Sequence, residues 1–196
     1  QLMKDNNVPD WYIESCQRIK YMFPRAHAVA YVMMSYRIAW FKVYYPVPFY
    51  AAYFTTKVAD FNSEVVLKGS GAILARIDEI LAKGKNATKK EEDEMTVLEV
   101  AYEMYSRGYE FEPINFGVSD GTKFYEHEGR VLLPFMAVSG IGETAAKALA
   151  DECRIRPFET IEELKSRTRI SNSNIESLKA MGVLEGMPET DQLSMF

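Results

Sequence analysis

Two prolines bound the most apolar stretch of the chain, and this stretch limits what the chain can fold into. The segment "AHAVAYVMMSYRIAWFKVYYP" starts just after Pro24 and ends at Pro46. It carries Arg37 and Lys42, so a buried helix fits it better than a membrane span. Proline and the residue before it are both unfavourable inside a helix. We therefore expect a helix over roughly residues 26–45.

This helix is apolar on two opposite faces. At about 100° per residue, one face carries mainly aliphatic and aromatic side chains: Val29, Val32, Tyr36, Ala39, Trp40 and Val43. The opposite face carries His27, Tyr31, Met34 and Ile38. Such a helix packs on both faces, or packs on one face and is covered by a ligand on the other. We expect Trp11 and Trp40 to lie in the core.

Most of the remaining chain carries helix signals. Pro9 suits the first turn of a helix that Pro24 ends. Asn62 is a capping residue type, and Thr88 with Glu91 has the spacing of a capping box. We expect a short helix after Asn62, a helix over 70–83 and a long helix after Thr88.

The pattern changes after Tyr109. Turn pairs occur at Asp120–Gly121 and Glu128–Gly129, with short β-like runs over 122–127 and 130–133. These features predict a small β-hairpin. We place a domain boundary near Phe116.

The next segment, "VSGIGETAAKALADECRI", has the pattern of a helix-hairpin-helix motif. Gly140 and Gly142 permit positive φ and a close approach of the backbone to a phosphate. The N–H groups at the start of the following helix then face the anion. A helix-capping turn that binds nothing is the alternative. The residues we expect to contact DNA here are Gly140, Ile141, Gly142, Glu143, Thr144 and Lys147.

A second, degenerate helix pair follows. The segment "RPFETIEELKSRTRISNSNIESLKAMGVLEG" reads as helix, turn, helix, but its turn lacks the Gly-x-Gly. We expect it to pack on the first pair and to present Arg167, Arg169 and Ser171 to DNA.

Composition limits the chemistry of the chain. The net charge of −5 argues against a general nucleic-acid coat protein, although it leaves room for a local basic site. The two cysteines and two histidines show no zinc spacing, and so few cysteines fit a reducing cytoplasm. No signal peptide is recognisable, and no membrane partner is expected. Because the chain starts on Gln1, we expect it to be part of a longer protein.

The run Phe23–Tyr31, "FPRAHAVAY", resembles the fingers of bacterial C-family replicative DNA polymerases. The longer segment "VPDWYIESCQRIKYMFPRAHAVAYV" is similar to the PolC branch of Gram-positive type. The resemblance continues through "KGKNATKKEEDEMTVLEVAYEMYSRGYEF" to the final "QLSMF", in the order of the family. It therefore covers essentially the whole chain.

The resemblance implies a DNA-directed DNA polymerase whose Mg²⁺ ligands lie in a palm subdomain outside this chain. No catalytic residue and no metal ligand are therefore expected in this chain, and the isolated chain is expected to be inactive. Contact with an incoming deoxynucleoside triphosphate is implied for Lys20, Arg25, His27 and Tyr31. The spacing of His27 and Tyr31 fits a helix-packing pair equally well. Arg37 and Lys42 are expected to be solvated or salt-bridged, with DNA contact as the second reading.

The C-terminal residues resemble the peptide with which bacterial polymerases bind the sliding clamp. They are Gln192, Leu193, Ser194, Met195 and Phe196. Leu193, Met195 and Phe196 would fill an apolar groove on the clamp, while the polar segment before them acts as a flexible tether. A frayed end, or one docked on its own domain, is the alternative.

We therefore expect a mainly α fold with three parts. Residues 1–115 form a fingers-like helical subdomain, 116–185 a tandem helix-hairpin-helix domain with a short β-hairpin, and 186–196 a flexible tether with the clamp peptide. The expected partners are primer–template or other double-stranded DNA, a deoxynucleoside triphosphate and the sliding clamp. A free-standing DNA-binding clamp adaptor is the alternative, although it has no need of the fingers-like residues 11–57.

Overall fold

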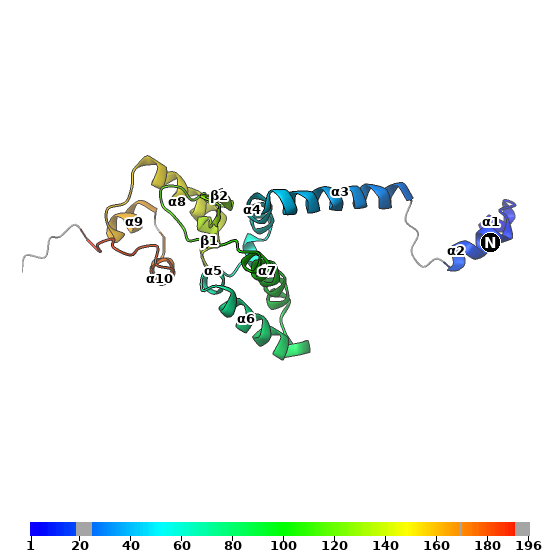
Figure 1. Cartoon of the computed structure of the whole chain (residues 1–196), viewed down its shortest axis with the longest axis horizontal. Helices are drawn as coiled ribbons and strands as arrows, with labels where there is room; N and C mark the ends of the chain where they lie inside the picture. Colours follow the sequence, from blue (N-terminus) through cyan, green and yellow to red (C-terminus); the bar gives the residue numbers. More distant parts are fainter. Residues whose placement is uncertain (19–24, 169, 191–196) are drawn as a thin grey trace, which may run out of the picture. The chain divides into compact units, whose positions relative to one another are not determined.

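The computed structural model describes residues 1–18, 25–168 and 170–190. In these residues the chain forms ten α-helices, three short 3₁₀ helices and one three-stranded sheet (Figure 1). The expected mainly α fold is thus confirmed. The chain divides into two compact units, Gln1–Tyr44 and Tyr45–Phe196.

The first unit contains α1 (Leu2–Asp5), α2 (Asp10–Arg18) and α3 (Arg25–Tyr44). The prediction of a buried helix is wrong for this chain, because none of the described residues of α3 is buried. Trp11 is 70% exposed and Trp40 is 43% exposed, so neither lies in the core. An all-round apolar pattern predicts that a helix is covered, but it does not say whether the same chain supplies the cover.

The second unit begins with α4 (Pro46–Thr56), α5 (Ser63–Val66), α6 (Ser70–Lys83) and α7 (Lys89–Ser106). The helix caps predicted from the sequence at Asn62 and Thr88 form in the structure. The Asn62 side chain accepts a hydrogen bond from the N–H of Val65, and Thr88 and Glu91 form a reciprocal capping box. These bonds satisfy N–H groups that a helix start otherwise leaves without partners.

Helices α6 and α7 pack side by side (Figure 1) and are joined by a partly buried ion pair. Arg76 donates to both carboxylate oxygens of Glu94, at 3.1 and 2.9 Å, and Asn62 donates to Glu94 at 2.7 Å. Burial by itself raises the pKa of Glu94, but these hydrogen bonds and the charge of Arg76 outweigh burial and lower it. The carboxylate therefore stays ionised and ties three segments together.

The sheet has the order β1-β3-β2, formed by β1 (Phe111–Glu112), β2 (Tyr125–His127) and β3 (Arg130–Leu132). The expected hairpin is confirmed by the antiparallel pairing of β2 with β3. Its turn residues Glu128 and Gly129 have φ of 49° and 78°, as a two-residue turn with two positive φ values requires. Strand β1, which pairs with β3 in parallel, was not predicted.

Aromatic rings connect α4 to the sheet. Phe54 is fully buried, and its ring centroid lies 5.0 Å from that of Phe111 and 5.9 Å from that of Phe124. The same hydrophobic cluster continues to Leu149 and Leu178 near the C-terminus, so it draws on residues from both sides of position 116. The expected division into functional parts at that position stays a prediction.

The C-terminal part consists of α8 (Glu143–Ile155), α9 (Ile161–Thr168) and α10 (Asn172–Ala180). Gly121 sets how closely the segment before β2 approaches α8. A Cβ on Gly121 would lie 2.8 Å from the Cα of Lys147, closer than such atoms can come. The glycine is therefore needed for packing between two backbones rather than for a turn alone.

Candidate nucleic-acid interface

The turn of the expected helix-hairpin-helix motif, called the hairpin below, lies between the short 3₁₀ helix Phe135–Ala137 and α8. The N–H of Ile141 donates to the carbonyl of Val138 at 3.1 Å, which closes a tight turn. Gly140, the third residue of this turn, has φ 84°, a value that side chains other than glycine rarely adopt. Positive φ was expected at both glycines, but Gly142 has φ −76° and ψ 165°. The turn therefore depends on Gly140, while Gly142 acts as the helix cap.

Helix α8 begins without a side-chain cap within the described part of the chain. The first N–H groups of a helix have no partner inside the helix, and its dipole makes this end positive. Residues Gly142 to Thr144 are exposed, whereas Ile141 is buried and anchors the turn. This end of α8 thus offers uncapped backbone donors at an accessible surface, which is an arrangement that suits a phosphate.

Two charged side chains border this helix end. Glu143 lies in the first turn of α8, and its carboxylate accepts a hydrogen bond from Lys147 at 2.5 Å. The bond and the charge of Lys147 lower the pKa of Glu143, so the carboxylate is charged at neutral pH. Glu143 therefore opposes an anion at this site, and Lys147 offsets part of that effect.

The second helix pair differs from the first at the equivalent helix start. Ser171 caps α10, and its hydroxyl accepts a hydrogen bond from the N–H of Asn174 at 3.2 Å. The N–H groups that α8 leaves open are thus partly occupied in α10. The absence of Gly-x-Gly in the sequence of this turn agrees with a helix start that is closed by its own side chains.

Arg167 makes contacts within the protein. Its guanidinium donates to the carboxylates of Glu152 and Glu163 at 3.0 to 3.1 Å. It also donates to the backbone carbonyls of Glu152 and Arg156, at 2.8 and 3.1 Å. It also lies 4.4 Å from the centroid of the Phe158 ring. These contacts hold α8 and α9 together. The expected contact between Arg167 and DNA stays a prediction that would require some of these bonds to open.

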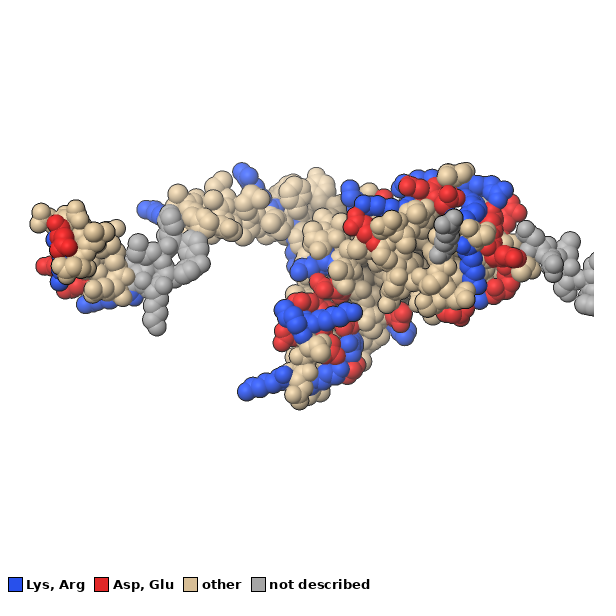
Figure 2. Space-filling view, turned by 180° about the vertical axis from the view of Figure 1, so that it is seen from behind, with Lys and Arg blue, Asp and Glu red and all other residues tan. Residues whose placement is uncertain are grey.

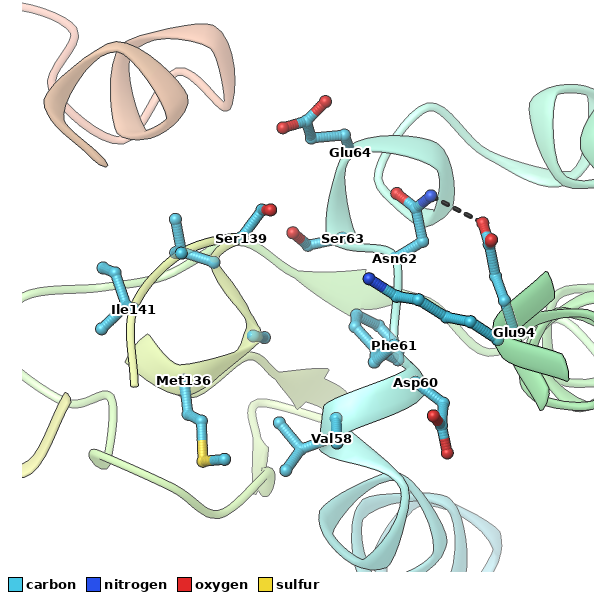
Figure 3. A pocket seen from close by; sticks show the side chains of 15 residues that line it. Val58, Asp60, Phe61, Asn62, Ser63, Glu64, Glu94, Met136, Ser139 and Ile141 are labelled. Atoms are coloured by element: carbon cyan, nitrogen blue, oxygen red, sulfur yellow. Dashed lines mark hydrogen bonds between the residues drawn. The ribbon is translucent and has the colours of Figure 1, made fainter. Parts of the chain in front are cut away.

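A pocket of about 370 Å³ opens beside the hairpin. Figure 3 shows Ser139 and Ile141 on one side of it and Asp60, Asn62, Ser63 and Glu64 on another. The hydrogen bond from Asn62 to Glu94, drawn dashed, fixes one wall. The pocket borders the hairpin but carries several carboxylates, so we do not assign it to DNA.

Three of the four residues expected to contact a nucleotide, Arg25, His27 and Tyr31, lie on α3. The rings of His27 and Tyr31 are brought together, with centroids 4.4 Å apart and planes at 64°. Arg25 is the first residue of the helix and is exposed. Helix α3 contains no acidic residue, and Figure 2 shows its surface as tan with isolated blue side chains.

Several predicted residues lie outside the described part of the chain. They are Lys20, Arg169, Gln192, Leu193, Ser194, Met195 and Phe196.

No group of three or more His, Cys, Asp and Glu residues suited to a metal ion occurs in the described residues. We therefore assign no Mg²⁺ ligand among them. The two described cysteines are unpaired, and burial raises the pKa of the Cys153 thiol to about 12, which disfavours its thiolate form. Within the described ranges, no helix is both long and apolar enough to span a membrane.

Comparison with known proteins tests the resemblance. A model of the helix-hairpin-helix motif matches residues 108–193. The DNA polymerase III PolC-type of Caldanaerobacter subterraneus subsp. tengcongensis is 54% identical over 194 residues, which is 99% of this chain and 14% of that protein. Over its whole length, this chain is similar to part of PolC-type DNA polymerase III. The expected resemblance is confirmed.

Other PolC-type relatives agree. The protein of Clostridium perfringens is 48% identical over 196 residues, all of this chain, and that of Bacillus subtilis is 45% identical over 194 residues. The chain spans 14% of the length of each of these PolC-type proteins. The match includes the fingers-like residues and the hairpin alike.

One residue near the site was missed in the sequence. Asn174 lies in α10 but donates from its side-chain amide to the carbonyl of Ser139, directly before Gly140. The spacing of Ser171 and Asn174 has the form of a capping box and was the available signal. The spacing does not reveal the second contact, which joins residues 35 apart in the sequence.

Proposed function

We propose that this chain is a DNA-binding part of a PolC-type DNA-directed DNA polymerase. The observation that carries the proposal is the turn at Gly140 followed by the uncapped start of α8, within the segment that matches the helix-hairpin-helix motif. Backbone donors recognise the phosphate of any nucleotide. The chain therefore binds double-stranded DNA at the phosphates of the DNA backbone, without sequence preference.

A titration of labelled duplexes of unrelated sequence at several salt concentrations tests this proposal. With about two to four phosphates neutralised, the logarithm of the affinity falls with the logarithm of the salt concentration with a slope of roughly −2 to −4. Strong discrimination among sequences, or no binding at low salt, would refute it.

The variant Gly142→Val separates binding from folding. The backbone of Gly142 has ordinary values for any residue, and a Cβ there would meet nothing within 4 Å. The valine therefore fits the fold but covers the N–H groups at the start of α8. We expect duplex binding to be lost and the far-UV helix signal to be retained. Gly71→Val, on an exposed part of α6, is the matched control that keeps binding.

We further propose that α3 takes part in binding the incoming deoxynucleoside triphosphate in the parent enzyme, with Mg²⁺ held by residues outside this chain. The positive charge of Arg25 and the exposed aromatic ring of Tyr31 support this role. Phosphoryl-transfer chemistry is largely positioning and charge neutralisation, which these groups supply without a metal ligand of their own. The isolated chain has no polymerase activity. Template-dependent incorporation by a contaminant-free preparation would refute this.

The third proposal concerns the C-terminal peptide. We infer that residues 192–196 bind the sliding clamp, and that the polar residues before them act as a tether. A free-standing clamp adaptor is less well supported, because similarity to PolC-type proteins extends through the fingers-like residues.

A further inference from the structure

We propose that Asn174 is a positioning residue for the phosphate-binding hairpin. It holds residues 139–142 in the shape that binds DNA, so the inference rests on the proposed DNA binding of that hairpin.

The contacts of the Asn174 side chain use both ends of its amide. The residue is only 7% exposed. Its Nδ2 donates to the carbonyl of Ser139 at 3.2 Å, and its Oδ1 accepts from the hydroxyl of Ser171 at 2.6 Å. One end requires a donor and the other an acceptor, so these partners fix which way the amide points.

The amide lies directly against the turn that gives the hairpin its shape. A Cβ on Gly140 would be 3.0 Å from Nδ2 of Asn174. The carbonyl that Asn174 holds belongs to Ser139, the residue just before Gly140. The bond therefore restrains the backbone at the point where φ of Gly140 is 84°. Releasing it leaves a buried amide donor without a partner, which is unfavourable.

Helix capping alone does not explain this arrangement. The capping box at the start of α10 needs Oδ1 of Asn174 and the hydroxyl of Ser171. It does not require a partner for Nδ2, the other end of the same planar amide. Through the bond from Nδ2 to Ser139, the second helix pair supports the hairpin of the first pair. The start of α10 itself is capped by Ser171.

The test uses the full chain and two pairs of variants. Asn174→Asp keeps the oxygen that the capping box needs but removes the donor to Ser139. Asn172→Asp adds the same charge at an exposed position two residues away. Asn174→Ala removes the whole amide, and Asn172→Ala makes the same truncation at an exposed position of the same helix.

Two measurements are made on each variant: duplex affinity by fluorescence anisotropy, and hydrogen exchange at the amide of Ile141, whose bond to Val138 closes the turn. We expect Asn174→Asp to bind about fivefold more weakly than Asn172→Asp, as the loss of one hydrogen bond implies. Asn174→Ala should be weaker than Asn172→Ala by a similar factor. Exchange at the amide of Ile141 should be faster in both Asn174 variants and unchanged in both controls.

Equal affinity and equal exchange within each pair would overturn the inference. If the unmodified chain does not bind duplex DNA, the proposed function fails. Hydrogen exchange still decides in that case whether Asn174 holds the hairpin, because it requires no DNA. Faster exchange with unchanged affinity in a chain that does bind DNA would also overturn the proposed positioning role.

Discussion

Replacing Gly140 with alanine tests how much of the hairpin depends on one backbone angle. The residue has φ 84°, where a Cβ is strained in any surroundings. Placing an L-residue in the left-handed region costs roughly 1–2 kcal/mol. The new Cβ would also lie 3.0 Å from Nδ2 of Asn174, whose amide is held by its bonds to Ser139 and Ser171. The strained angle alone therefore accounts for a loss of this size, and crowding against Asn174 adds to it.

Thermal unfolding followed by circular dichroism measures this loss. For a unit of this size a loss of 1–2 kcal/mol lowers Tm by about 2 to 8 °C. Gly71→Ala is the matched control, since Gly71 lies in the first turn of α6 with open space around it and without positive φ. Alanine there should stabilise the chain by about 0.4–1 kcal/mol, because it restricts the unfolded state.

The two alanine variants should therefore shift Tm in opposite directions. A Gly140→Ala chain as stable as the unmodified one would show that the turn does not need positive φ. The description of the hairpin would then be wrong, whatever the affinity for DNA.

Three further results are expected. The hydrogen bond from Lys83, together with those from Thr88, lowers the pKa of Glu91 to about 2. The stability that this ionised carboxylate provides is therefore complete above the ordinary carboxyl pKa and is lost as the pH falls towards 2. Urea midpoints measured from pH 7 to pH 2.5 should fall below about pH 4.5, and less steeply for Glu91→Gln; parallel curves would contradict this. Glu143→Gln should tighten duplex binding about two- to fivefold at low salt, because it removes a negative charge from the start of α8, and weaker binding would count against a phosphate at that helix end. Deleting residues 192–196 should abolish clamp binding measured by titration, with Phe196→Ala the most harmful single change; a large fall in Tm with clamp binding intact would show that the peptide belongs to the core.

Signals that act over three or four residues could be read from the sequence. The capping box of Thr88 and Glu91, the cap at Asn62 and the turn at Glu128–Gly129 all form where expected. Each depends on residues that are neighbours in the chain, so the backbone geometry follows from local sterics and hydrogen bonds. The same holds for the turn at Gly140, although the sequence did not distinguish its role from that of Gly142.

Contacts between distant segments could not be read in this way. Strand β1 is two residues long, too short for an alternating pattern, and it exists because β3 pairs with it. In α6, Ile73, Ile77 and Ile80 are buried, but the neighbouring Leu81 is 58% exposed. A hydrophobic period gives the direction of the core but not its width, which depends on the elements that pack there.

The sequence by itself therefore determined the helical class, the β-hairpin and the resemblance to PolC-type polymerases, because these depend on local patterns and on the order of motifs. Only the tertiary structure decided that Arg167 joins α8 and α9, that Asn174 supports the hairpin and that none of the described residues of α3 is buried. The physical reason is that a polar side chain takes whichever partner folding brings within about 3 Å. An apolar surface likewise becomes buried only where another element meets it. Neither partner is specified by the residue type alone.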